Sequence, residues 1–298
     1  MGGQAVIEGV MMRGKRHWAL AVRRPDGGIS LHSEELRPLA DRYKVLRWPV
    51  LRGIIGLWES LTLGMRALTM SANESMGEEE EEISKPEMVI SIIIGIVLAV
   101  ALFVVLPLFA VRSVRHVIPN STVFVLLEGI LRIFILVAYI WAVSRIKQLR
   151  RVFEYHGAEH KTIHALEAGL ELTPDNVRRF SPVHPRCGTS FLLIVMVLAI
   201  IVFTFVGVPG LFWLVVSRLL GIPLVVRLSY EVLKFAGKHK DSRIMGIIMY
   251  PGLLLQKMTT KEPDTSQIEV AIKALEGVAA MEPIEMDHDG KADVEVMA

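Results

Sequence analysis

Four side chains suited to metal chemistry lie close together in the stretch FEYHGAEHKTIHALEAG at residues 153–169. His156 and His160 are four positions apart, so on a helix both imidazoles lie on one face and can reach a single metal ion. Glu159 directly precedes His160, which gives the order H-x-x-E-H, in which the glutamate is the general base that activates a metal-bound water. His164 continues the same face one turn further. The pattern predicts a metal site with Glu159 as its catalytic residue.

A simpler interpretation is that these residues form the polar face of a cytoplasmic helix, which Lys161 and Glu167 continue. Gly157 argues against it, because a glycine inside a helix costs about 1 kcal/mol relative to alanine and therefore suggests a close approach by another segment. The short pattern alone does not decide between the two interpretations.

Further candidate ligands follow in the stretch HPRCGTS at residues 184–190. His184 and Cys187 stand at the start of an apolar segment, and imidazole and thiolate both suit zinc or iron. Cys187 is the single cysteine of the chain, so an intramolecular disulfide is excluded, and the thiol is a ligand, a nucleophile or a small buried side chain. Glu231 is a further possible carboxylate ligand. We expect His184 and Cys187 to lie near the 156–164 helix face.

The composition indicates an integral membrane protein. Of the 298 residues 52% are hydrophobic, and the mean hydropathy is +0.45, too apolar for an ordinary soluble protein. The uncharged run at 88–109 is long enough to cross a hydrocarbon layer of about 30 Å. The run at 123–143 is as long but carries Glu128 and Arg132, which are four apart and expected to pair. The apolar region at 191–226 is interrupted by GVPG, so it predicts a hairpin of two spans.

The fold class predicted is therefore a mainly α-helical polytopic membrane protein with four transmembrane helices and a small N-terminal β unit. In residues 4–36, the short runs QAVIEGVMMR, HWALAVRR and ISLHSEEL predict strands, with PDGG between the last two as a hairpin turn. The predicted segments are a β unit at 1–43, an amphipathic helix in the membrane surface at 44–72, an acidic linker at 73–87, transmembrane helices at 88–109, 123–143, 190–207 and 210–226, a cytoplasmic His-rich segment at 144–189, cytoplasmic helices at 227–281 and a disordered acidic tail at 282–298. A fifth crossing at 44–72 is the alternative, and it would move the β unit to the other side of the membrane.

The distribution of basic residues predicts the orientation. Lys and Arg are abundant before the first span, in the segment at 144–189 and at the C-terminal end, while the loop at 110–122 has two arginines. The positive-inside rule then places both termini and the candidate site in the cytoplasm. The N-terminus lacks the pattern of a cleavable signal, so none is expected. We expect a multi-pass membrane protein with this orientation.

Five stretches of the chain resemble the YqhQ-like family of bacterial membrane proteins, which are predicted to be metal-dependent enzymes. They are GGQAVIEGVMMRG, EYHGAEHKTIHALEAG, HPRCGTSF, RLSYEVLKFAGKH and TTKEPDTSQIEVAIKALE, and the similarity runs over nearly the whole chain. The resemblance implies that the protein lies in the bacterial inner membrane. It also implies that the family motifs contain the residues Glu8, His156, Glu159, His160, His164, His184 and Cys187.

Three functional hypotheses follow. In the first, the protein is a metal-dependent hydrolase in which Glu159 is catalytic and the metal ligands come from His156, His160, His164, His184 and Cys187. In the second it binds the metal without turnover, as a sensor, carrier or structural site. In the third it is a scaffold for membrane-protein assembly without a metal. The expected cofactor is a divalent ion, with zinc first. The expected partner is the lipid bilayer and not nucleic acid, and the sequence leaves open the substrate, any protein partner and homo-oligomer formation.

Overall fold

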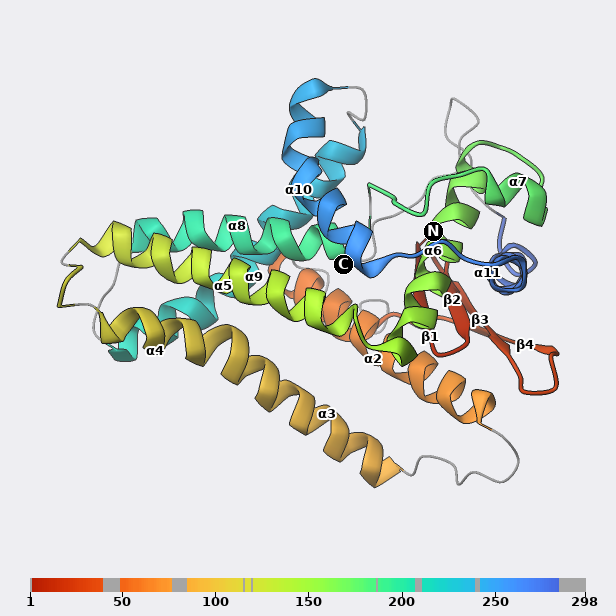
Figure 1. The fold of residues 1–298 in the computed structure, drawn as a ribbon, viewed down its shortest axis with the longest axis horizontal. Coiled ribbons are helices and arrows are strands. Elements are labelled where there is room, and N and C mark those ends of the chain that lie inside the picture. The colour runs from red at the N-terminus through yellow and green to blue at the C-terminus, as the bar shows by residue number, and fades with distance from the viewer. Residues whose placement is uncertain are drawn as a thin grey trace.

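The computed structural model describes residues 2–39, 49–76, 85–114, 116–118, 120–185, 187–206, 211–238 and 242–283. The strands are β1 (Gly2–Val6), β2 (Gly9–Arg13), β3 (His17–Arg23) and β4 (Ile29–Glu35). The helices are α2 (Pro49–Ser75), α3 (Lys85–Val100), the π-helical η2 (Ala101–Val105), α4 (Leu106–Ser113), α5 (Ser121–Val143), α6 (Lys147–Glu167), α7 (Pro174–Arg178), α8 (Gly188–Val206), α9 (Leu211–Lys238), α10 (Arg243–Thr259) and α11 (Thr265–Ala279). Figure 1 shows long helices at one end of the molecule and the sheet with α6, α7 and α11 at the other.

The N-terminal unit is an antiparallel sheet in the order β1-β2-β3-β4. Neighbouring side chains of a strand point to opposite faces, and in β3 both faces are buried. Trp18 and Leu20 pack with Leu63 of α2 on one face. The alanines at 19 and 21 pack with α6 and α11 on the other, where their small side chains permit a close approach. The sheet is therefore held between helices from distant parts of the chain.

The first predicted strand run differs from the structure. QAVIEGVMMR is not one strand, because β1 and β2 pair with each other across a tight turn in which Val6 opposes Gly9. Glu8 in this turn has φ of 50°, a conformation that non-glycine residues rarely adopt. The expected PDGG turn is confirmed, since Gly27 has φ of 84° and its N–H donates to the Arg24 carbonyl. The Val6–Gly9 turn lacks the Asn-Gly or Asp-Gly pair that marks a two-residue hairpin turn, so a strand pattern alone does not reveal it.

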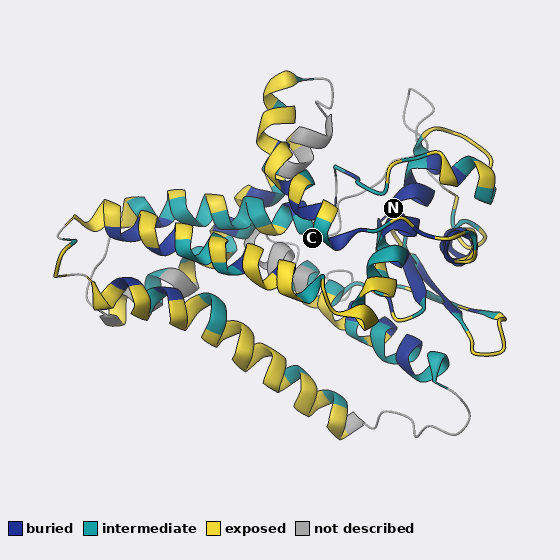
Figure 2. Ribbon diagram, in the orientation of Figure 1, coloured by how far each residue is buried: buried dark blue, intermediate teal, exposed yellow. Residues whose placement is uncertain are grey.

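Three helices of the described residues are long and apolar enough to cross a membrane: Pro86–Ser113, Ser121–Val143 and Gly188–Val206. They correspond to three of the four predicted spans. The predicted fourth span lies within α9, which is not among these three and which continues without a break to Lys238, past the expected end at residue 226. Figure 2 shows that α3 is exposed over most of its length, as expected for a helix that faces lipid.

A proline explains the irregular end of the first span. Pro107 has no N–H to donate to the carbonyl of Phe103, four residues earlier, and the helix changes to the π form at Ala101–Val105. Arg132 Nε of α5 donates to that Phe103 carbonyl at 2.7 Å, and Arg132 also pairs with Glu128 at 2.6 Å. The predicted Glu128–Arg132 pair is confirmed. Two charges of α5 and one freed carbonyl of η2 are thus satisfied between two candidate membrane helices.

Several of the predicted segments extend beyond the described residues, including residues 44–48 of the surface helix and residue 210 of the fourth span. The predicted surface helix at 44–72 corresponds to α2, which starts at Pro49 and continues to Ser75, and most of the acidic linker lies outside the described residues. The predicted C-terminal tail begins at Glu282, whose carboxylate accepts hydrogen bonds from the backbone N–H groups of Lys15 and Arg16 at 2.7 and 2.9 Å. Residues 284–298 of the tail lie outside the described residues.

Helix α6 connects the membrane helices to the sheet, and the segment between α10 and α11 crosses it closely. Lys261 N–H donates to the Phe153 carbonyl at 2.9 Å, and a Cβ at Gly157 would overlap the Lys261 carbonyl oxygen. The predicted close approach at Gly157 is confirmed. The segment then enters α11 through a capping box formed by Asp264 and Gln267.

We expect Gly157→Ala to destabilise the protein by at least about 1 to 3 kcal/mol, because an added methyl group meets backbone, which cannot rotate away. Thermal unfolding in detergent, followed by size-exclusion chromatography, measures the change. Gly246→Ala is the matched control, since a Cβ at this helical glycine has no atom within 4 Å. An unchanged Tm for Gly157→Ala would contradict the contact.

Candidate metal centre

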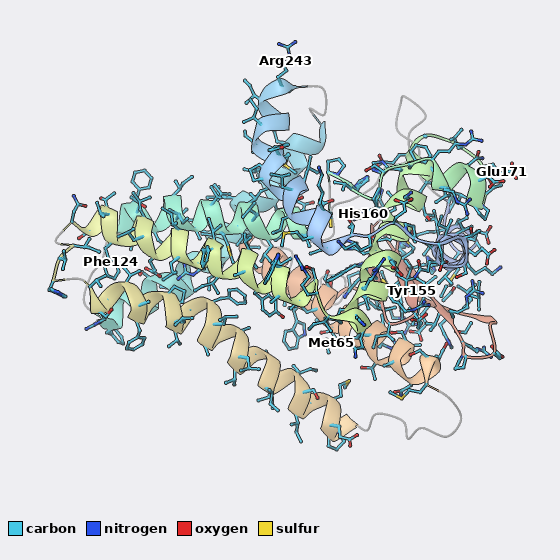
Figure 3. The ribbon with its side chains drawn as sticks, in the orientation of Figure 1. Met65, Phe124, Tyr155, His160, Glu171 and Arg243 are labelled. Carbon is cyan, nitrogen blue, oxygen red and sulfur yellow. The ribbon has the colours of Figure 1, made fainter. Side chains whose placement is uncertain are left out.

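The candidate residues of α6 lie on the buried side of the helix. Glu159 and His160 are 4% and 2% exposed, although the helix as a whole is polar. Figure 3 shows His160 where α6 meets the end of α10. The polar-face interpretation of residues 153–169 therefore does not describe Glu159 and His160, which are covered by other elements and not by water.

The loop after α6 brings Cys187 to the histidines. Cys187 Sγ lies 3.3 Å from His156 Nε2, and together with His160 these residues offer ligand atoms that all lie within 4.8 Å of one another. The expectation that Cys187 lies beside the 156–164 face is confirmed. The arrangement joins Cys187, which directly precedes α8, to the middle of α6.

Backbone carbonyls fix the orientation of three imidazoles. His156 Nδ1 lies 2.9 Å from the Thr259 carbonyl, and His160 Nδ1 lies 2.7 Å from the Pro182 carbonyl. A ring nitrogen that donates to a carbonyl carries the proton, so the Nε2 atoms of both rings keep a lone pair. This is the arrangement in which metal-bound histidines are usually held. The proton positions follow from the hydrogen-bond partners.

Burial and neighbouring charges set the protonation of the group. Burial lowers the pKa of His160 to about 4, and the electrostatic effect of the neighbouring His156 acts in the same direction, so His160 is neutral at pH 7. Burial raises the pKa of the Cys187 thiol, but its interactions with His160 and Thr189 outweigh this effect and leave that pKa below its usual value. A neutral imidazole and a thiolate are the forms that bind metal ions.

Glu159 lies beside this group, but the hydrogen bonds described above do not include its carboxylate. Its carboxylate packs on Gly3 of β1, where an added Cβ would lie 2.7 Å from Oε1. Its Oε2 atom is buried and has no hydrogen-bond partner among the described residues. Burial raises the pKa of Glu159 to about 8, while His156 lowers it and Cys187 raises it. An unbonded, buried carboxylate oxygen beside soft and borderline ligands fits a site that binds a cation or water.

The remaining predicted ligands form a second group. His164 and His184 are brought together with Glu167, and their ligand atoms also lie within 4.8 Å of one another. Glu167 was missing from the predicted ligands, although it lies three positions after His164 on the same face of α6, which is a usable signal. Glu231 is exposed on α9 and belongs to neither group.

Glu8, which the family resemblance included, serves a different contact. Its carboxylate pairs with Arg151, which donates to Oε2 at 2.5 Å, and it accepts from the Tyr155 hydroxyl at 3.2 Å. The unusual backbone at Glu8 thus aims its side chain at α6, one turn before His156. Glu8 helps to fix α6 against the sheet.

Comparison with known proteins gives the same family as the motifs. Residues 48–281 match the family described as a protein of unknown function, DUF1385. The chain belongs to the DUF1385 family. This DUF1385 protein is 34% identical over 296 residues to the uncharacterized protein YqhQ of Bacillus subtilis (strain 168). The alignment covers 95% of this chain and 93% of the relative. No solved structure matches this DUF1385 protein significantly.

Proposed function

We propose that this membrane protein binds a divalent metal ion, zinc first, through His156, His160 and Cys187. The observation that carries the proposal is the distance of 3.3 Å between Cys187 Sγ and His156 Nε2. Zinc bonds of about 2.0 Å to nitrogen and 2.3 Å to sulfur separate two such ligands by roughly 3.5 Å at a tetrahedral angle. Two imidazoles and a thiolate also suit zinc better than magnesium or calcium.

We further propose that the centre is hydrolytic. Three protein ligands leave a fourth position open, which is the pattern of catalytic zinc sites and not of structural ones. A zinc ion held there would supply a Lewis acid and lower the pKa of a coordinated water. Glu159, adjacent to His160, would take the proton from the attacking water and return it to the leaving group.

A non-catalytic metal site is the second candidate, and burial favours it. Cys187 is 9% exposed and His160 is 2% exposed, so substrate access requires movement of the covering segments. A metal ion bound there would join α6, the following loop and the start of α8. The function would then be a sensor, a carrier or a structural link between the sheet and the membrane helices.

Elemental analysis of the purified, full-length protein in detergent tests metal binding. We expect the wild-type protein to bind about one equivalent of zinc at Cys187 and His156. The variants Cys187→Ser and His156→Ala are each expected to lose this equivalent. His116→Ala is the matched control, because this histidine is exposed and lies in the loop between two spans. Wild-type protein that contains no bound metal, even after reconstitution with zinc, would contradict the proposal and favour the scaffold hypothesis.

We also propose the full topology: four crossings, of which the fourth is residues 210–226, with both termini and the metal centre in the cytoplasm of a bacterium. The excess of Lys and Arg at 144–189 supports this orientation, as does the reduced thiol that the site requires.

Cysteine labelling tests that orientation. On a Cys187→Ser background, Val117→Cys in the loop between the first two spans is expected to react with an impermeant reagent in intact cells. Glu171→Cys, after α6, is expected to react only after permeabilisation. Both positions are exposed. Reaction of position 171 from outside intact cells would reverse the topology.

A further inference from the structure

The second group of potential ligands lies one turn further along α6 and is built as fully as the first. Glu167 Oε1 lies 3.3 Å from His184 Nε2, and the ligand atoms of His164, Glu167 and His184 all lie within 4.8 Å of one another. Oxygen and nitrogen ligands of a tetrahedral zinc ion, each about 2.0 Å from the metal, lie roughly 3.3 Å apart. His184 is 3% exposed.

Residues outside this group orient its two histidines through hydrogen bonds. His164 Nε2 lies 3.0 Å from the Val183 carbonyl, so it carries the proton and Nδ1 keeps the lone pair. The backbone of His184 is bound on both sides by the buried side chain of Gln256: its N–H donates to Gln256 Oε1 at 2.9 Å, and its carbonyl accepts from Gln256 Nε2 at 2.8 Å. Such outer contacts orient ligands before a metal binds.

The ligands of both groups come from the same two segments, α6 and the loop that leads to α8. His156, His160, His164 and Glu167 come from one face of α6, while His184, Cys187 and the carbonyls that orient His160 and His164 come from one loop. The imidazoles of His160 and His184, one from each group, have centroids 5.8 Å apart. This spacing leaves no element between the groups.

We propose that His164, Glu167 and His184 form a second divalent-cation site, adjacent to the first, so that the protein holds a pair of metal ions. The ligands are two imidazoles and a carboxylate without sulfur. This set suits zinc, manganese or iron(II), whereas the thiolate group favours zinc. Adjacent metal ions in hydrolytic enzymes stabilise both the attacking and the leaving oxygen, so the inference extends the proposed function but rests on its own residues.

Cobalt(II) binding to the metal-free, full-length protein distinguishes the two sites. A cobalt ion bound by Cys187 gives a thiolate-to-metal charge-transfer band, whereas a cobalt ion bound by His164, Glu167 and His184 gives none. We expect wild-type protein to bind about two equivalents of cobalt. Glu167→Gln and, independently, His164→Ala are expected to lose one equivalent and keep the charge-transfer band, while Cys187→Ser loses the band and one equivalent.

The matched controls are Glu171→Gln, which is exposed just beyond α6, and His116→Ala. The Tm of each variant shows that it is folded. Binding of a single equivalent that Glu167→Gln and His164→Ala leave unchanged would overturn the second site and leave the proposed function intact. Binding of a single equivalent without a charge-transfer band, lost in Glu167→Gln, would support the second site and contradict the first. No binding to folded wild-type protein would overturn both.

Discussion

His160→Ala is expected to lower the affinity of the Cys187-containing site for zinc by more than about 100-fold. Changes in residues that only orient a ligand already cost about 10- to 100-fold, and His160 is proposed as a ligand itself. It is 2% exposed and neutral at pH 7, with Nδ1 bound to the Pro182 carbonyl, so water does not easily replace the lost nitrogen. Competition with a chromogenic chelator measures the affinity, and the cobalt–thiolate band identifies the site.

Glu159→Gln is the matched change at the neighbouring position, and its expected result is different. The amide fills the same volume beside Gly3 but does not accept a proton, so zinc affinity is expected to stay within about 10-fold while hydrolysis falls by about 10²- to 10⁴-fold. Turnover is measured on a panel of ester, amide and phosphate-ester substrates with zinc-loaded protein. If Glu159→Gln loses zinc as severely as His160→Ala, Glu159 is a ligand or holds one, and the hydrolytic proposal fails.

Gln256→Leu is expected to have the largest effect on stability. The Gln256 side chain is fully buried and binds the His184 N–H, the His184 carbonyl and, at 2.6 Å, the hydroxyl of Ser190. A leucine leaves these polar groups buried without those hydrogen bonds, at about 1 to 3 kcal/mol for each. We therefore expect the free energy of unfolding to fall by at least about 3 kcal/mol. At about 2 °C per kcal/mol, the lower value for domains of about 150 to 250 residues, the Tm decreases by at least about 6 °C.

The same change also separates the two proposed sites. Gln256 holds the backbone of His184 but contacts neither His156 nor His160 in any hydrogen bond found, so the second cobalt equivalent is expected to weaken more than the one with the thiolate band. Gln148→Leu is the matched control, because Gln148 is exposed at the start of α6. Equal Tm values for the two variants would show that Gln256 does not support this part of the structure.

Local spacing made much of the fold readable. The length of an apolar run determines whether a helix can span the membrane, and three of the four expected spans are among the candidate helices. Positions four apart lie together on any helix, which accounts for the Glu128–Arg132 pair and the shared face of His156 and His160. The capping pair at Asp264 is likewise a local pattern.

Contacts between distant segments were not readable in this way. The turn at Glu8 carries no strong turn signal, and its unusual backbone is accompanied by contacts to Arg151 and Tyr155, more than 140 residues away. The burial of Glu159 and His160 depends on the sheet and on the segment before α11, which cover a helix that is polar by composition. A sequence periodicity describes one helix face but not what covers it.

The ligand groups show the same division. The sequence by itself determined that His156, His160 and His164 share a helix face and that His184 and Cys187 stand directly before a long apolar segment, because both facts follow from spacing along the chain. Only the tertiary structure decided that Cys187 joins His156 and His160 while His184 joins His164 and Glu167. The physical reason is that the loop from 168 to 187 has no periodic pattern, and its path is fixed by packing and by hydrogen bonds such as those of Gln256, which comes 72 residues after His184.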